Sequence, residues 1–172
     1  GHVGEVLVQH LTESGALVTI TDINEDRVNQ VGAKHGAKIF TGADLYSADV
    51  DIYAPCALGA TINDATINNF KASIIAGAAN NQLANEAVHG KILKEKGILY
   101  APDFLINAGG VINVYSELVK WTNAQVMEKT ENIYNTALEI FKFADDNNIT
   151  THQAAFSVAQ KRIDDAKNEL KK

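Results

Sequence analysis

The sequence predicts an α/β fold in which a doubly wound, mainly parallel sheet is followed by C-terminal helices. From residue 1 to about residue 104, short β-branched runs alternate with helical stretches that end at glycine, a pattern typical of parallel strands with crossover helices. Gly1 and Gly4 open the first helical stretch, and Asp22 ends the next apolar run about twenty residues later. After Asn107 the pattern is helical only. Together these observations indicate a Rossmann-like unit, which binds a dinucleotide.

The composition limits the classes of function. The chain has 172 residues, of which 46% are hydrophobic, enough for one well-buried domain with an appendage. Its net charge of -6 comes from scattered charges of both signs, so we expect no nucleic-acid partner. Cys56 is the single cysteine, the histidines show no metal-ligand spacing, and no apolar run reaches the roughly 20 residues of a membrane helix. We therefore expect a cytoplasmic protein without a metal, a disulfide or a membrane partner.

Secondary structure follows from the periodicity of the apolar residues. Five strands are predicted, at residues 17–21, 38–40, 51–54, 73–76 and 98–101. Helices are predicted between the strands at residues 2–13, 25–35, 64–70 and 85–96, and after them at residues 111–121, 123–147 and 151–171. Three of the helices are followed by a glycine that suits a left-handed cap, namely Gly15, Gly36 and Gly97. One face of helix 123–147 is apolar and needs a partner surface.

The opening turn is an incomplete dinucleotide fingerprint. The full pattern has three glycines and follows a strand, whereas here the first glycine and that strand are absent, so Gly1 and Gly4 match the second and third. We therefore expect the first strand of the fold to be missing and the chain to be a piece of a larger enzyme. Because that strand is central in the six-strand order, two other strands should lack a hydrogen-bonding neighbour.

Asp22 indicates which dinucleotide is bound. A carboxylate at the end of this strand can accept hydrogen bonds from both hydroxyls of the adenine ribose and would repel a 2′-phosphate, so it favours NAD over NADP. Gly1 would let the backbone approach the pyrophosphate, and Gly4 would let the helix pack closely on the sheet. A glycine-rich helix start without a ligand remains the alternative for the turn. Helix capping is the alternative for Asp22, and its two roles can coexist.

Three further loops follow predicted strands, where a doubly wound sheet has its ligand crevice. Cys56 and Ala57 lie in an apolar run that leaves room for a flat ring, and a buried, unreactive thiol is favoured over a nucleophile there. Asn80 belongs to an amide cluster that can bond ribose hydroxyls or a carboxamide, or cap the next helix. Asn107 precedes a glycine pair and a helix N-terminus, which favours a bound carboxylate.

Four long motifs make the identification more specific. They are TDIN at residues 21–24, DIYAPCALGA at 51–60, IAGAANNQL at 75–83 and YAPDFLINAGGVINV at 100–114. Together they resemble the leucine dehydrogenases of the glutamate, leucine, phenylalanine and valine dehydrogenase family, with compatible spacing over the whole chain. The resemblance implies oxidative deamination of an L-amino acid, L-leucine or another branched-chain acid, to the 2-oxo acid and ammonia, with hydride passing to NAD.

The resemblance also implies roles for individual residues and for the two parts of the chain. Residues 1–122 would form the NAD-binding domain, and residues 123–172 would be helices that pack back on a missing N-terminal substrate domain. In the family that domain carries the lysine and aspartate that transfer protons, so no catalytic residue is expected here. Matching motifs assign the pyrophosphate to Gly1, His2, Val3 and Gly4, the adenine ribose to Asp22, the nicotinamide ribose to Cys56 and Ala57, the nicotinamide to Ala78, Asn80 and Asn107, and the substrate to Asn107 and Gln153.

Gln153 lies where the sequence departs from the family. Leucine members usually read Tyr-Val-Ala-Ala-Asp at this point, and this chain reads His-Gln-Ala-Ala-Phe at residues 152–156. A polar residue in place of an apolar one bears on selectivity for the substrate side chain. Valine, phenylalanine or glutamate therefore stays open as the substrate, as does a dinucleotide-binding module that has no catalytic half. The family further implies a homo-oligomer, with which the apolar helices are consistent.

Overall fold

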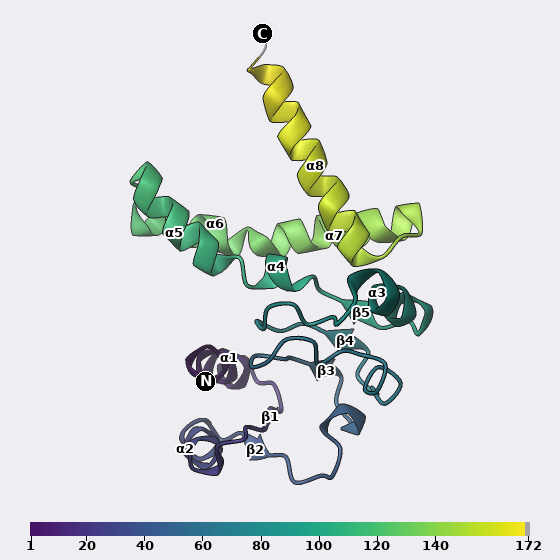
Figure 1. Ribbon diagram of the computed structural model, residues 1–172. Helices are drawn as coiled ribbons and strands as arrows, with labels where there is room; N and C mark the ends of the chain where they lie inside the picture. The colour runs from purple at the N-terminus through teal and green to yellow at the C-terminus, as the bar shows by residue number, and fades with distance from the viewer. Residues whose placement is uncertain (171–172) are drawn as a thin grey trace.

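A computed structural model of the chain, which describes residues 1–170, has an α/β architecture with two small parallel sheets (Figure 1). The first sheet pairs β1 (Thr19–Ile20) with β2 (Lys38–Ile39). The second has the order β3-β4-β5, formed by Ile52–Tyr53, Ile74–Ile75 and Leu99–Tyr100. Every pairing is parallel, which confirms the predicted fold class, although each strand is shorter than predicted.

The two sheets separate at the point where the first strand of the fold was predicted to be missing. In the six-strand order that strand lies between the neighbours corresponding to β1 and β3. Within the described residues, β1 pairs only with β2, and β3 pairs only with β4. Each of these strands therefore has one ladder edge without a strand partner, as the incomplete opening motif predicted.

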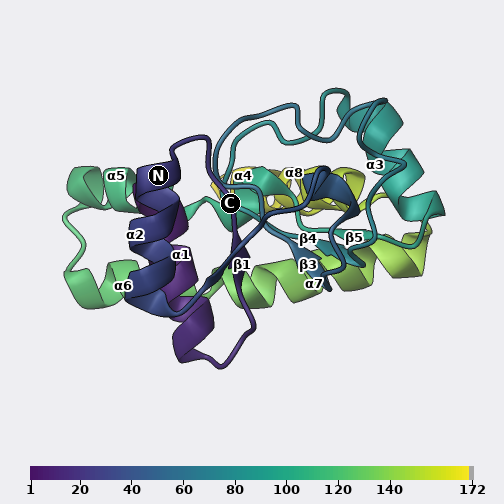
Figure 2. The same ribbon diagram turned by 90° about the horizontal axis from the view of Figure 1, so that it is seen from below.

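The helices that flank the sheets begin and end close to their predicted positions. Helix α1 (His2–Glu13) and helix α2 (Glu25–His35) lie side by side near β1 and β2 (Figure 2), while α3 (Glu86–Glu95) packs near β5. Asn24 and Asn85 accept capping hydrogen bonds at the starts of α2 and α3, so Asn24 takes the capping role considered for Asp22. The caps predicted at glycine are also confirmed, since Gly15, Gly36 and Gly97 all have positive φ.

Between β5 and residue 170, all the regular elements are helices. The elements are α4 (Asp103–Ile106), α5 (Gly109–Val119), α6 (Asn123–Glu131), α7 (Ile133–Asn147) and α8 (Thr151–Glu169). Helices α5, α6 and α7 form a layer beside the second sheet, and α8 projects away from the body (Figure 1). No helix within residues 1–170 is both long and apolar enough to cross a membrane.

Three expectations about local structure were wrong. Residues 64–70 form turns, since the Thr66 hydroxyl donates to the Thr61 carbonyl and the Asn63 side chain accepts from Ala65, bonds that compete with helix formation. Helix 123–147 is interrupted at Asn132, between α6 and α7. Two short helices, η1 (Leu45–Ser47) and α4, were missed because they are too short to produce a periodic pattern.

Two clusters of buried side chains hold these layers together. One joins the second sheet, α3 and the segments that follow β3 and β4, and it contains Ile62, Ile67, Ile75, Leu83, Leu93 and Tyr100. The other joins α4, α7 and α8 and contains Leu105, Ala137, Ile140, Ala144, Ala154, Ala155 and Val158. Much of the apolar face predicted for residues 123–147 therefore finds its partner within the chain. Tyr134 on the same helix is exposed, and packing of these helices on a further domain stays a prediction.

The split sheet predicts unequal local stability. The amides of Lys38 and Phe40 donate to β1, whereas those of Ala76 and Ala101 donate within the three-stranded sheet. Because a strand pair without further neighbours opens more readily, we expect Lys38 and Phe40 to exchange at least about tenfold faster in native-state hydrogen exchange. Equal protection of the four amides would contradict the idea that the missing neighbour weakens β1 and β2.

Candidate cofactor site

The start of α1 and the end of β1 form one wall of the candidate site. Although they are distant in sequence, the terminal nitrogen of Gly1 lies 3.5 Å from Asp22 Oδ2. No side chain caps α1, so the N–H groups of its first turn lack intrahelical partners and are available to an anion. A Cβ atom built on Gly1 would meet no atom within 4 Å, so the approach to this turn is open. The arrangement fits a pyrophosphate.

Asp22 is held ready to accept further hydrogen bonds. Its Oδ1 atom accepts the backbone N–H of Asn24 at 3.0 Å, while Oδ2 faces the start of α1. The hydrogen bond from Asn24 lowers the pKa of Asp22 and outweighs the opposing effect of burial, so the side chain stays ionised. Asn24, rather than Asp22, is the N-cap of α2. The carboxylate thus shapes the turn before α2 and keeps one oxygen free of bonds within that turn.

Glu5 lies in the first turn of α1, where its negative charge would oppose a bound anion. Its carboxylate bonds Lys34 at 2.9 Å and Arg27 at 2.5 Å, both of which belong to α2. The hydrogen bond from Lys34 is the main cause that lowers the pKa of Glu5; burial opposes it, and the charges of Lys34 and Arg27 lower the pKa further. The two cations neutralise this carboxylate and fasten α1 to α2, so the first turn of α1 remains suited to an anion.

The loop after β3 forms the next wall. A Cβ atom on Gly4 would lie 3.6 Å from Cys56 Cβ, which places the opening turn of α1 against this loop. Cys56 is half-buried with a free thiol, so it is less enclosed than predicted, and Ala57 beside it is exposed. The residues predicted to bind the pyrophosphate therefore lie next to those predicted to bind the nicotinamide ribose.

Backbone contacts join the loops after β3 and β4. Ala79 donates its N–H to the Pro55 carbonyl at 2.9 Å, and Ala60 donates to the Asn81 carbonyl at 2.7 Å. The two loops approach so closely that a Cβ atom on Gly77 would overlap the backbone of Pro55. These contacts set the spacing of the loops at the carboxyl ends of adjacent parallel strands, where a ligand crevice is expected.

Asn107 links the third loop to the second. Its Nδ2 atom bonds the Asn80 side chain and lies 3.4 Å from the carbonyl oxygen of Ala78. Asn107 is the C-terminal cap of α4 and is half-buried, while Asn80 is exposed. The three residues predicted for the nicotinamide therefore come together, although they come from segments almost thirty residues apart, with Asn107 and Ala78 separated by 29 positions.

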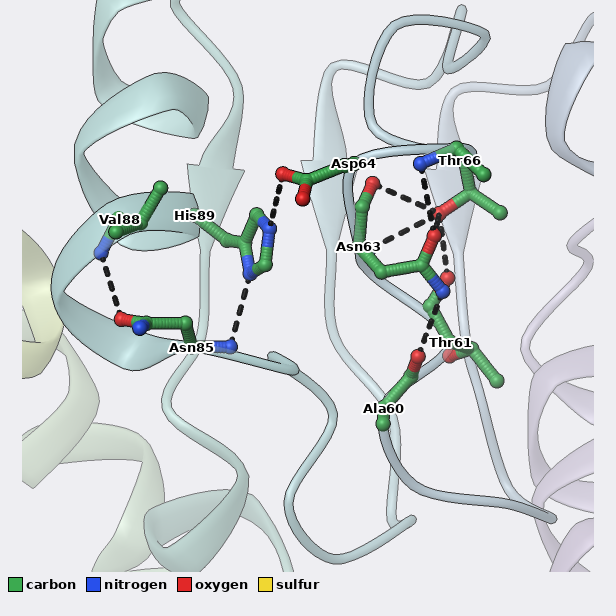
Figure 3. Close-up of polar contacts among 9 residues, drawn as sticks. Ala60, Thr61, Asn63, Asp64, Thr66, Asn85, Val88 and His89 are labelled. Atoms are coloured by element: carbon green, nitrogen blue, oxygen red, sulfur yellow. Dashed lines mark hydrogen bonds and ion pairs between the residues drawn. The ribbon is translucent and has the colours of Figure 1, made fainter.

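A hydrogen-bond network supports the far side of the loop after β3 (Figure 3). Asn63 Nδ2 donates to the carbonyl of Ala60, which has positive φ. His89 is buried and spans two segments, because its Nδ1 atom accepts the N–H of Asn85 and its Nε2 atom lies 3.1 Å from Asp64 Oδ1. His89 thus has a structural role. Within residues 1–170, no group of three or more His, Cys, Asp or Glu side chains could hold a metal ion.

Gln153 lies apart from the other predicted site residues. It occupies the first turn of α8, and its Oε1 atom accepts the N–H of Thr150 at 3.1 Å while Thr150 Oγ1 accepts the N–H of Gln153. This reciprocal pair is a capping box, which explains a glutamine at this position by helix stability. A substrate contact by Gln153 stays a prediction.

Sequence reasoning missed two residues that hold the site together. Gln82 belongs to the same run of amides as Asn80 but is completely buried, and buried Asp103 accepts its backbone N–H. Burial, and then the charge of Asp103, raise the pKa of nearby Tyr100, whose hydroxyl accepts the Asp103 N–H. A buried carboxylate needs partners. The position of Asp103, directly after Pro102 and a predicted strand, was therefore the sequence signal for a buried carboxylate that bonds neighbouring segments.

Comparisons with known proteins agree with this geometry. The family model for glutamate/leucine/phenylalanine/valine dehydrogenase matches residues 5–170. The chain is 44% identical to an L-tryptophan dehydrogenase of Nostoc punctiforme over 172 residues, and 46% identical to a leucine dehydrogenase of Thermoactinomyces intermedius over 164 residues. These alignments cover 100% and 95% of this chain, but 49% and 44% of the two relatives. The chain thus spans about half the length of the curated relatives that it matches.

The fold agrees equally well with a solved structure. The crystal structure of L-tryptophan dehydrogenase from Nostoc punctiforme superposes with a TM-score of 0.92 at 45% identity, covering 96% of this chain and 50% of that one. The chain therefore belongs to the glutamate/leucine/phenylalanine/valine dehydrogenase family. The family consists of NAD(P)-dependent dehydrogenases and its leucine members use NAD, which confirms the cofactor that the sequence predicted.

The close approach at Gly77 predicts a strict requirement for glycine. In a Gly77→Ala variant the new methyl group must displace the Pro55 backbone, so we expect the free energy of unfolding to fall by about 1–3 kcal/mol. Chemical denaturation measures this change. Gly90→Ala is the matched control, because a Cβ atom there meets its nearest neighbour at 3.8 Å inside α3, and alanine should stabilise by about 0.5–1 kcal/mol. A neutral Gly77→Ala change would refute the close packing of the two loops.

Proposed function

We propose that this chain is the NAD-binding part of an amino acid dehydrogenase, which converts an L-amino acid, NAD and water to the 2-oxo acid, ammonia and NADH. The observation that carries the proposal is the meeting of Asn107 with Ala78 and Asn80, beside a loop that also contacts the start of α1. A cofactor lying along this crevice would reach both from the open turn at Gly1. The family of the chain supports the same activity.

Each wall of the crevice has a distinct task in this proposal. The N–H groups of His2, Val3 and Gly4 bind the pyrophosphate, and Asp22 accepts hydrogen bonds from the adenine ribose. Cys56 and Ala57 lie along the nicotinamide ribose. NAD supplies the hydride acceptor when bound, and the chain's own contribution is to bind and orient it. In the whole enzyme that we propose, an N-terminal substrate domain supplies the groups that move protons on the substrate.

Asn107 is the residue through which the chain contacts both cofactor and substrate. Its amide is fixed by the Ala78 carbonyl and the Asn80 side chain, so it has a defined orientation at the edge of the crevice. It also stands one residue before Ala108, the N-cap of α5, which has no capping side chain. The free N–H groups there favour a substrate carboxylate.

We propose a branched-chain amino acid, L-leucine, as the substrate. The identity of 46% to a leucine dehydrogenase supports it, together with the four motifs at residues 21–24, 51–60, 75–83 and 100–114. An aromatic amino acid is the second candidate, because an L-tryptophan dehydrogenase is 44% identical. Aromatic side chains of Phe104 and Phe156 also pack together with centroids 5.5 Å apart and remain partly exposed. Valine, phenylalanine and glutamate are further alternatives within the family.

We also propose that the protein is cytoplasmic and that it forms a homo-oligomer, which an exposed apolar surface on α5 supports. Helix α5 exposes Val111, Val114, Tyr115 and Leu118. A row of large apolar side chains of this kind is typical of a surface that contacts another domain or subunit. We propose that it is covered in the assembled homo-oligomer.

Activity should depend on more than this chain. We expect the 172-residue chain to bind NAD but to show no NADH formation with L-leucine, because the proton-transferring groups are elsewhere. A preparation that also contains the N-terminal domain should turn over L-leucine faster than L-valine, L-phenylalanine, L-tryptophan or L-glutamate. Turnover by the chain alone would contradict the proposal, and a strong preference for glutamate or tryptophan would contradict the choice of substrate.

Asp22 should select NAD over NADP. In an Asp22→Ser variant we expect about tenfold weaker NAD binding, since charge-assisted hydrogen bonds to the ribose are lost, and stronger NADP binding, since the repulsion of the 2′-phosphate is removed. The lowered pKa of Asp22 keeps the carboxylate charged until the pH falls below its ordinary value of 3.8, so wild-type affinity for NAD should be flat between about pH 5 and 8. Titration calorimetry at several pH values measures both effects. An NAD affinity that falls on acidification within this range would contradict the role of Asp22.

A further inference from the structure

We propose that Gln82 is a positioning residue that holds the loop of residues 77–80 in place for the nicotinamide end of the cofactor. Gln82 lies beneath this loop and does not reach the crevice, because its side chain is completely buried. The inference rests on the proposed function in one respect, the assignment of Ala78 and Asn80 to the nicotinamide. The hydrogen bonds that carry it do not depend on that assignment.

The amide of Gln82 binds both sides of Ala78. Its Nε2 atom donates to the carbonyl of Gly77 at 2.7 Å and to the carbonyl of Ala79 at 2.9 Å. Carbonyl oxygens only accept, so the amino group of the amide must face them and both of its hydrogens are used. The carbonyl of Ala78, between these two, is the one that Asn107 contacts. Gln82 therefore fixes the peptide units that present Ala78 to the crevice.

Asp103 connects this arrangement to the third loop. Its Oδ2 atom accepts the backbone N–H of Gln82 at 3.2 Å, and its Oδ1 atom accepts the N–H of Phe104 at 2.9 Å. Asp103 begins α4, and Asn107 caps the other end of this four-residue helix. The loops after β4 and β5 are thus joined at two points, by Gln82 with Asp103 inside the protein and by Ala78 and Asn80 with Asn107 at the crevice.

The donors of Gln82 are what distinguish it from an apolar residue at this position. Its Oε1 atom is buried and has no partner among the described residues, which is unfavourable for an amide. Filling the space would require only a side chain of similar volume, such as methionine. What glutamine adds is the pair of hydrogen bonds to the carbonyls of Gly77 and Ala79, which would otherwise be left without a side-chain donor.

Loss of these bonds should change the position of the loop more than the fold. The loop remains next to the loop after β3 through the bond from the Ala60 N–H to the Asn81 carbonyl and through the close approach at Gly77, while the bond from Ala79 to Pro55 opens more often. The binding groups at Gly1 and Asp22 lie at the start of α1 and in the turn after β1, and the hydrogen bonds of Gln82 go to other residues. A loss of affinity confined to the nicotinamide end of the cofactor would therefore distinguish a positioning role of Gln82 from general destabilisation of the protein.

The test compares two ligands in a Gln82→Met variant of this chain. Titration calorimetry measures the affinity for NAD and for ADP-ribose, which has the adenosine, the pyrophosphate and the second ribose but no nicotinamide. We expect NAD to bind about tenfold more weakly and ADP-ribose to bind within about twofold of wild type, as the loss of two hydrogen bonds to one loop implies. Gln160→Met is the matched control, because Gln160 is exposed on α8 and bonds only Asp164, and it should change neither affinity.

Hydrogen exchange tests, without any ligand, whether Gln82 holds the loop of residues 77–80 in place. In Gln82→Met the amide of Ala79 should exchange at least about tenfold faster, while the amide of Ala76 in the sheet should be unchanged. If Gln82→Met does not fold, Asp103→Asn carries the test, since it weakens the same connection with little change in volume. For Asp103→Asn we expect a loss of affinity for NAD that is smaller than in Gln82→Met, and no loss of affinity for ADP-ribose.

The outcomes separate this inference from the proposed function. If the wild-type chain binds neither NAD nor ADP-ribose, the proposed function is overturned, and the assignment of Gln82 to the nicotinamide falls with it. If wild type binds both, an unchanged NAD affinity in Gln82→Met, an equal loss for both ligands, or unchanged exchange at Ala79 would overturn the inference alone and leave the proposed function intact.

Discussion

The candidate site depends on the contact between the loops after β3 and β4. The N–H of Ala79 reaches the carbonyl of Pro55, and the absence of a side chain at Gly77 allows the two backbones to come this close. Because the strands are parallel and adjacent, the loops emerge at the same edge of the sheet. Their spacing determines where Cys56 lies relative to Ala78, next to the start of α1.

Charge is arranged around this crevice in a way that suits an anionic ligand in a chain that is acidic overall. The first turn of α1 has uncapped N–H groups, and the one carboxylate within that turn, Glu5, is paired with Lys34 and Arg27. Asp22 keeps its charge at the point where a sugar, rather than a phosphate, would lie. The favourable potential is thus local and comes from backbone dipoles, which explains why no basic patch is visible in the sequence.

The structure also shows which parts of the fold are self-sufficient. The second sheet has a buried core, and so does the group of helices α4, α7 and α8. Hydrogen bonds of Gln82, Asp103 and His89 support the loops of the candidate site. By contrast, β1 and β3 have unpaired edges and α5 exposes a row of apolar side chains. These features agree with a family in which the chain spans about half the length of its relatives.

The sequence by itself determined the α/β class, the order of the parallel strands, the ends of most helices and the family, because periodicity, capping residues and long motifs are local signals. It also predicted that Ala78, Asn80 and Asn107 lie together, since strand ends in a doubly wound sheet converge. Only the tertiary structure decided which residues support them. Gln82 and Gln153 look alike in sequence, yet one is buried beneath a loop and the other completes a capping box, because burial and hydrogen-bond partners come from segments distant in the chain. For the same reason the turns at residues 64–70 replaced a predicted helix: Thr66 found its partner in the carbonyl of Thr61, outside the segment that the periodicity describes.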